Sequence, residues 1–172
     1  YLGHAAYMMS MEDICRRHKL WMIEDCALAL GTYHTDRHVG LIGDIGCFSF
    51  YPCKHITTGE GGMLLTKHPE IAEQAKKLRS FGYGADSHSD VTRAGFNYRM
   101  SEIQAAIGVA QLKRFPKMLA ARKVNAAFLG RALDEYKPFG GHYAVGCFVP
   151  KGEDRDEVRQ RLWAAGVETS IY

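Results

Sequence analysis

The sequence lacks the features that would place it in a membrane, outside the cell or on nucleic acid. It has no run of the roughly 18 consecutive apolar residues that a membrane-spanning helix needs. Its five cysteines form an odd set without a C-x-x-C pair, and no leader pattern opens the sequence. Its 22 basic and 19 acidic residues are spread along the chain, so no basic block favours nucleic acid. We therefore expect a cytoplasmic protein that binds a small molecule.

Helical and strand-like patterns alternate along the first part of the chain. With 172 residues and 47% hydrophobic content, the chain can form one sizeable core. A capping box of Ser10 and Asp13 predicts a helix over residues 11–19. The apolar run 20–23 then predicts a buried parallel strand, and further strands are expected at 47–51 and 62–66. A helix should begin at Pro69. This order indicates an α/β layer structure.

The second part of the chain predicts a long loop followed by helices. Residues 79–100 are polar and rich in glycine, which is typical of a functional or partner-contacting loop. Ser101 and Gln104 form a capping box, and Pro116 marks an expected helix break. A helix over 117–136 and a strand over 142–149 should follow. The box of Asp154 and Glu157 then predicts a helix that ends at Gly166. We accordingly expect two domains, 1–115 and 116–172.

Lys54 and Asp25 are the residues with the most suggestive chemistry. Lys54 lies in a loop of glycine, proline and small polar residues just after a predicted strand, where irregular backbone can wrap a ligand. Asp25 follows the strand at 20–23, and open parallel sheets bind ligands at the carboxyl ends of their strands. A lysine amine can form a Schiff base and a carboxylate can keep a ring nitrogen protonated, so the pair indicates pyridoxal phosphate. The alternatives are a solvated surface lysine and an acidic residue that caps a turn.

Other candidate residues carry weaker signals. The hydroxyl group of Ser49 could bind a phosphate, although an ordinary strand serine is the simpler interpretation. The glycines of residues 57–62 match neither nucleotide-binding spacing and favour a tight turn. His34 and His38 lack an identifiable third metal ligand, so we expect no metal site. Cys53 lacks a positioned base and is expected to be a packing residue.

Four motifs together resemble the DegT/DnrJ-type sugar aminotransferases, a family within the fold-type I aspartate aminotransferase superfamily. They cover most of the chain in order: residues 23–31 (IEDCALALG), Gly43-Asp44, residues 49–62 (SFYPCKHITTGEGG) and residues 95–100 (GFNYRM). The resemblance implies a partial three-layer α/β/α large domain that binds pyridoxal phosphate, with the beginning of a small C-terminal α+β domain. It also implies a homodimer whose active sites lie at the subunit interface.

The resemblance assigns a role to four residues. Lys54 would form the Schiff base and carry protons, Asp25 would contact the pyridine nitrogen, and Ser49 would bind the phosphate. Asn97 would reach the phosphate of the neighbouring subunit's cofactor. The expected reaction moves an amino group from glutamate to a nucleotide-linked keto sugar, for the synthesis of a polysaccharide or an antibiotic sugar.

Two departures from the family leave alternatives open. Leu28 stands where the family usually has glutamine or histidine, and the chain is shorter than the family at both ends, as expected of a fragment. A catalytically silent interaction or regulatory protein is therefore one alternative. A sugar dehydratase is another alternative. The related dehydratases have histidine in place of the lysine, so Lys54 favours transamination. The adjacent His55 is the reason why elimination stays an alternative.

Overall fold

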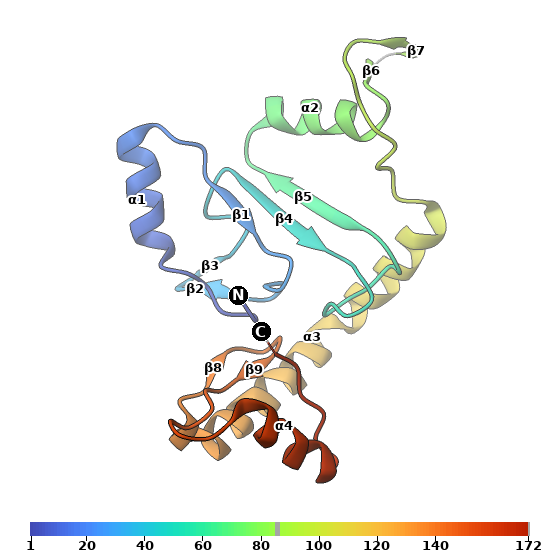
Figure 1. Ribbon diagram of the computed structural model, residues 1–172. Coiled ribbons are helices and arrows are strands. Elements are labelled where there is room, and N and C mark those ends of the chain that lie inside the picture. Colours follow the sequence, from blue (N-terminus) through green and yellow to red (C-terminus); the bar gives the residue numbers. More distant parts are fainter. Residues whose placement is uncertain (85–86, 172) are drawn as a thin grey trace.

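A three-stranded sheet forms the centre of the molecule (Figure 1). The computed structural model describes residues 1–84 and 87–171. The sheet contains β1 (Ile23–Asp25), β4 (Ile45–Ser49) and β5 (Gly62–Thr66), in that spatial order. β1 runs parallel to β4, whereas β5 runs antiparallel to it. The mixed α/β class predicted from the sequence is confirmed.

The strand predictions differ in accuracy. The strand at 62–66 is confirmed to the residue, whereas the strand predicted at 47–51 runs two residues earlier, over Ile45–Ser49. The bounds predicted as 20–23 are wrong, because Leu20 and Trp21 precede β1 and are exposed. The apolar run therefore contains exposed as well as buried side chains, and residue type alone does not distinguish the two.

Helix α1 (Met8–His18) begins earlier than predicted. Ser10 lies inside the helix and the N-cap Tyr7 makes no side-chain capping bond, so the predicted capping box is wrong. Asp13 instead accepts hydrogen bonds from Arg16 and Arg17, one helical turn further on. Such i,i+3 and i,i+4 pairs stabilise a helix surface without marking its start.

Helix α2 (Pro69–Arg79) confirms the prediction that Pro69 opens a helix. The segment predicted as a polar loop begins after it. This segment contains a short antiparallel pair, β6 (Tyr83–Gly84) and β7 (Ser87–Val91), with an irregular register. The expected loop is thus partly ordered as a small hairpin.

Helix α3 (Glu102–Ala132) is continuous through Pro116, so the predicted break is wrong. Phe115 and Met118 flank the proline and both pack against the core, which compensates for the backbone hydrogen bond that proline cannot donate. The capping box is confirmed: the Ser101 hydroxyl accepts from the Gln104 amide at 3.3 Å, and the Gln104 side chain accepts from the Ser101 amide at 2.9 Å. The expected domain boundary at 115/116 falls inside this helix and stays a prediction.

The C-terminal part contains only short strands. After the 3-10 turn at Asp134–Tyr136, β8 (Phe139–Gly140) pairs with β9 (Val145–Gly146), so the strand predicted over 142–149 is wrong in length. Helix α4 (Arg155–Ala164) follows. Its N-cap Asp154 accepts from the amides of Asp156 and Glu157, which confirms the predicted helix start, although no bond from the Glu157 side chain completes the box. Gly166, with a positive φ of 81°, follows its end as predicted.

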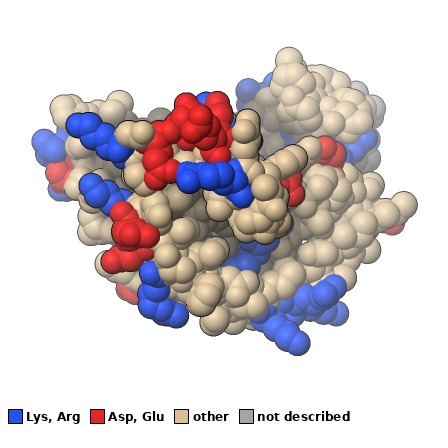
Figure 2. Space-filling view, turned by 60° about the horizontal axis from the view of Figure 1, so that its bottom comes forward, with Lys and Arg blue, Asp and Glu red and all other residues tan. Residues whose placement is uncertain are grey.

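The core lies between the sheet, α1 and α3. Buried side chains from α1, β4 and the connecting segments form it: Met8, Met22, Cys26, Ala29, Val39, Ile42, Phe48, Phe50 and Ile56. Another short hairpin, β2 (Tyr33–His34) with β3 (Arg37–His38), leads into the loop at 39–43. On the face shown in Figure 2, basic and acidic side chains are interspersed with uncharged surface. Among residues 1–84 and 87–171, no helix is long and apolar enough to cross a membrane.

Candidate active site

Asp25 and Ser49 lie at the same edge of the sheet. They are the last residues of the parallel strands β1 and β4, and Asp25 is paired in register with Cys47. Asp25 is exposed, and its carboxylate accepts a 3.0 Å hydrogen bond from the backbone amide of Ala27. Ser49 is half-buried, and its hydroxyl oxygen accepts from the backbone amide of Tyr51 at 3.3 Å. A carboxylate and a hydroxyl group therefore mark the carboxyl edge of the sheet, where open α/β sheets bind ligands.

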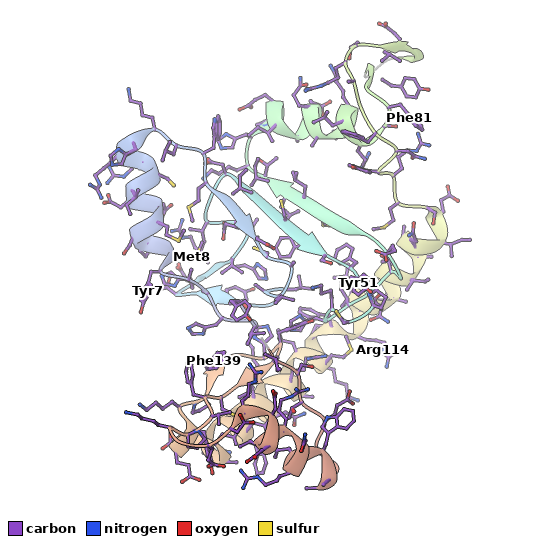
Figure 3. All side chains as sticks on the ribbon, in the orientation of Figure 1. Tyr7, Met8, Tyr51, Phe81, Arg114 and Phe139 are labelled. Carbon is purple, nitrogen blue, oxygen red and sulfur yellow. The ribbon has the colours of Figure 1, made fainter. Side chains whose placement is uncertain are left out.

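Lys54 lies in the loop that leaves this edge. The loop is closed by backbone hydrogen bonds from the Phe50 amide to the Gly61 oxygen at 2.9 Å and from the Thr58 amide to the Phe50 oxygen at 3.0 Å. Within it, the Lys54 amide donates to the Tyr51 oxygen at 3.0 Å. In Figure 3, the labelled Tyr51, which belongs to this loop, lies beside α3. The loop that carries Lys54 is thus an ordered turn that continues directly from β4.

The side chain of Lys54 has no acidic partner within the described part of the chain. It is half-buried and forms no ion pair among the residues that the structure describes. Its Nζ atom lies 5.7 Å from the centre of the Tyr143 ring. An amine that no carboxylate neutralises is available to a ligand that contains an aldehyde group.

A cluster of aromatic rings that the sequence did not predict packs against the loop that carries Lys54. His55 is buried, and its ring centre lies 4.9 Å from that of His142, 5.2 Å from Tyr143 and 6.2 Å from Phe115. Its Nε2 atom has no hydrogen-bond partner among the described residues. Burial, together with the charge of His142, lowers the pKa of His55 to about 4. Burial also lowers the pKa of His142. Both rings are therefore neutral near pH 7.

Glu24 is a second residue that sequence reasoning missed. It is buried, and its carboxylate accepts hydrogen bonds from the backbone amides of Gly40 at 2.7 Å, Ile42 at 2.9 Å and Gly43 at 2.6 Å. Its partners lie 16 to 19 residues further along the chain, so no local pattern announces them. Glu24 holds the loop at 40–43 against β1, the strand that ends at Asp25.

Asp44 fixes the start of β4 in a similar way. Its carboxylate accepts from the Met22 amide at 2.9 Å and contacts His68 Nε2 at 2.8 Å. These bonds lower the pKa of Asp44, with the Met22 amide the largest cause. Glu24 and Asp44 thus connect β1 to the segment at 40–44 that leads into β4.

Asn97 lies on a different segment from the other three predicted site residues. It is exposed between β7 and α3 and forms an isolated antiparallel bridge with Ser80. The following residues line a cavity of about 340 Å³ with the turn after the Lys54 loop: Glu60, Gly61, Gly62, Tyr98, Arg99, Met100 and Gln104. The structure therefore brings Asp25, Ser49 and the Lys54 loop to one edge, and leaves Asn97 on the neighbouring surface.

His38, one of the two histidines considered as metal ligands, has structural contacts. The Nε2 atom of His38 accepts from the Gly31 amide at 2.9 Å, and its Nδ1 atom contacts the Val39 oxygen. Nδ1 therefore carries the proton. Residues 1–84 and 87–171 contain no group of three or more His, Cys, Asp or Glu side chains placed to hold a metal. His38 therefore stabilises the turn before β2 through its hydrogen bond with the Gly31 amide.

The donor groups at this edge fit pyridoxal phosphate. The cofactor has an aldehyde, a ring nitrogen and a phosphate, and the loop and strand ends offer an amine, a carboxylate and a hydroxyl group. Leu28, which follows Asp25 by one turn, is half-buried and adds an apolar side chain. The residues present thus match the chemistry of the cofactor.

Comparisons with known proteins show the family to which the chain is similar. The profile of the DegT/DnrJ/EryC1/StrS aminotransferase family matches residues 1–172. A GDP-perosamine synthase of Caulobacter vibrioides is 43% identical over 180 residues, which cover 97% of this chain and 48% of that protein. The UDP-N-acetyl-3-dehydro-alpha-D-glucosamine 3-aminotransferase of Acidithiobacillus ferrooxidans is 33% identical, with 99% and 47% covered.

A solved structure shows the same fold. The DegT DnrJ EryC1 StrS aminotransferase from Brucella abortus superposes with a TM-score of 0.88 at 29% identity, over 99% of this chain and 47% of that one. The chain spans about half the length of these relatives. The chain belongs to the DegT/DnrJ/EryC1/StrS aminotransferase family.

Proposed function

We propose that the chain is part of a sugar aminotransferase that moves an amino group from glutamate to the keto carbon of a nucleotide-linked sugar. The observation that carries the proposal is Lys54, which lies in the loop that leaves the Asp25–Ser49 edge and whose amine forms no ion pair with the acids that the structure describes. Family membership implies pyridoxal phosphate as the cofactor. The relatives named GDP-perosamine synthase and UDP-sugar 3-aminotransferase support a nucleotide sugar as substrate.

Each site residue has a role in the proposed reaction. Pyridoxal phosphate, when bound, supplies the electron sink that lets an amino group pass between two substrates. Lys54 would hold the cofactor covalently and move protons at the reacting carbon. Asp25 would keep the ring nitrogen protonated, because a nearby carboxylate favours the charged form. Ser49 would donate its hydroxyl hydrogen to a phosphate oxygen.

Asn97 takes its role from a second copy of the chain. We propose a homodimer in which Asn97 reaches the phosphate bound to the partner. Its surroundings support this, because Phe96, Tyr98 and Ile103, which are close to it in the sequence, are apolar residues that are 56%, 71% and 77% exposed. The rings of Phe96 and Tyr98 stack at 5.0 Å. Exposed apolar patches of this kind mark protein interfaces. All five cysteines are free thiols, which supports a cytoplasmic location.

Two other functions remain distinguishable from amino transfer. A sugar dehydratase has the same fold, as GDP-4-keto-6-deoxymannose-3-dehydratase shows with a TM-score of 0.88 at 23% identity. Lys54 favours transfer, because a lysine amine can move the proton at the reacting carbon. The second alternative is a catalytically silent interaction or regulatory protein, which is expected if Leu28 prevents cofactor binding. Product analysis separates the first alternative, since elimination removes a sugar oxygen without adding an amine.

The direct test is covalent capture of the cofactor. The purified chain is mixed with pyridoxal phosphate, reduced with borohydride and digested, and the modified lysine is identified by mass spectrometry. We expect modification on the Lys54 peptide and its loss in Lys54→Arg, with Lys151→Arg as the control because Lys151 is exposed. Modification spread over the surface lysines, with none at Lys54, would contradict the proposal.

A further inference from the structure

Tyr143 contacts three consecutive residues of the loop that carries Lys54. Its hydroxyl group donates to the backbone oxygen of Cys53 at 3.3 Å and lies 3.5 Å from the Cys53 sulfur. The Lys54 Nζ atom lies 5.7 Å from the centre of its ring. The His55 ring centre is 5.2 Å away. Tyr143 therefore contacts the loop at the residue before the lysine, at the lysine and at the residue after it.

The backbone of Tyr143 is held in place by residues outside this loop. The Tyr143 backbone oxygen accepts from Arg122 Nη1, on α3, at 3.2 Å. The backbone of Gly3 packs so closely that a Cβ atom there would lie 2.7 Å from the Tyr143 nitrogen. The neighbouring His142 is buried and its Nε2 atom contacts the Leu30 oxygen at 3.1 Å. The backbone of Tyr143 is thus fixed by residues outside the loop, and its side chain packs against the loop.

We propose that Tyr143 is a positioning residue for Lys54, because its ring face holds the ammonium group of the free lysine. A cation within about 6 Å of an aromatic centroid is attracted by the negative face of the ring. The role of this contact rests on the proposed function: Lys54 must leave the cofactor during amino transfer and stay close enough to move protons. A lysine side chain has four rotatable carbons and would otherwise lose that position. The ring gives the free amine a defined place.

The test reads the position of Lys54 without cofactor and without activity. Lysines of the full chain are reductively methylated with ¹³C-formaldehyde, and the Lys54 signal is identified by its loss in Lys54→Arg. A methylammonium group over a ring face is shifted upfield by the ring current. We expect this shift for Lys54, its loss in Tyr143→Leu and its retention in Tyr143→Phe, which keeps the ring. A Lys54 shift that persists in Tyr143→Leu would overturn the proposal.

A second measurement covers the case in which Tyr143→Leu does not fold. In the unsubstituted chain, a nuclear Overhauser effect should connect the Lys54 methyl groups with the Tyr143 ring protons, and its absence would also overturn the proposal. Borohydride capture of pyridoxal phosphate on Lys54 is scored separately. Capture without the Overhauser effect would leave the proposed function standing and reject the role of Tyr143. The Overhauser effect without capture would confirm the contact between Lys54 and Tyr143 but reject the proposed function, and with it the role of the contact in amino transfer.

Discussion

The backbone amide of Ile42 donates a 2.9 Å hydrogen bond to the buried carboxylate of Glu24, one residue before Asp25. The amides of Gly40 and Gly43 donate to the same carboxylate. A buried charged group is tolerated only when its hydrogen bonds are made, and here backbone donors make them. Glu24 therefore connects the stability of the 40–43 loop to the strand that presents Asp25.

Replacing Glu24 should destabilise the whole protein. Glu24→Ala leaves the amides of Gly40, Ile42 and Gly43 without their acceptor, and we expect a loss of about 3 kcal/mol in the free energy of unfolding, measured by urea denaturation. The neighbouring Asp25→Ala is the matched control. Asp25 is exposed and accepts one backbone bond, so its loss should cost less than about 1 kcal/mol. Equal effects of the two substitutions would contradict this account of Glu24.

Asp25 should matter for function more than for stability. If its carboxylate contacts the ring nitrogen of the cofactor, it raises the pKa of that nitrogen by about 1 to 3 units. Asp25→Asn removes this interaction, and we expect the transfer rate to fall by about 10- to 1000-fold. The rate of the first half-reaction with glutamate is measured by rapid mixing. Asp36→Asn, an exposed acid in the turn between β2 and β3, is the control. A folded Asp25→Asn chain with an undiminished rate would reject the assigned contact.

The buried ring of His55 predicts a loss of stability in mild acid. The folded chain holds its pKa at about 4, chiefly through burial, against an ordinary value of about 6.5. Between these values the unfolded chain binds a proton that the folded chain does not. Stability is therefore complete above about pH 6.5 and falls as the pH drops towards 4.

Urea denaturation at a series of pH values from 7 to 4 measures this effect. In His55→Phe, the slope of stability against pH should become shallower over that window, with the remaining slope due in part to His142, whose pKa is also lowered. Phe115→Leu removes packing from the same ring cluster without removing a titrating group. It should lower stability equally at every pH. A slope in His55→Phe as steep as in the unsubstituted chain would show that His55 is not the cause.

Local signals made the fold predictable where neighbouring residues decide the structure. Pro69 and the box of Ser101 with Gln104 mark true helix starts, because their contacts span at most a few residues. The box of Ser10 and Asp13 failed because Asp13 pairs with Arg16 and Arg17 instead. The break expected at Pro116 failed because packing of the flanking side chains outweighs a missing backbone bond.

The candidate site was predictable only in part for the same reason. The chemistry of Lys54, Asp25 and Ser49 is visible in residue type and position after predicted strands. The support beneath them is not, since Tyr143 meets Cys53 across 90 residues and Glu24 meets Gly43 across 19. Such contacts depend on how the loops close, and a pattern of neighbouring residues contains no information about that closure.

Gly46 and Gly130 should respond in opposite ways to alanine. A Cβ atom at Gly46 would lie 2.3 Å from the Gly40 oxygen and 2.5 Å from the Gly40 Cα atom, so backbone must move and we expect a loss of about 3 kcal/mol. Gly130 lies in α3 with nothing within 4 Å of a new Cβ atom, and Gly130→Ala should add about 0.5 to 1 kcal/mol.

A double substitution connects this pair to Glu24. Gly46 is the register partner of Glu24, and its close approach to Gly40 is what brings the Gly40 amide to the carboxylate. Gly46→Ala should therefore displace the loop that Glu24 binds. Combined with Glu24→Ala, the loss of unfolding free energy should be smaller than the sum of the two single losses, because both changes break the same contacts. In Glu24→Ala with Gly130→Ala, the two changes in the free energy of unfolding should add. If the changes also add in Glu24→Ala with Gly46→Ala, Gly46 does not act on the loop that Glu24 binds.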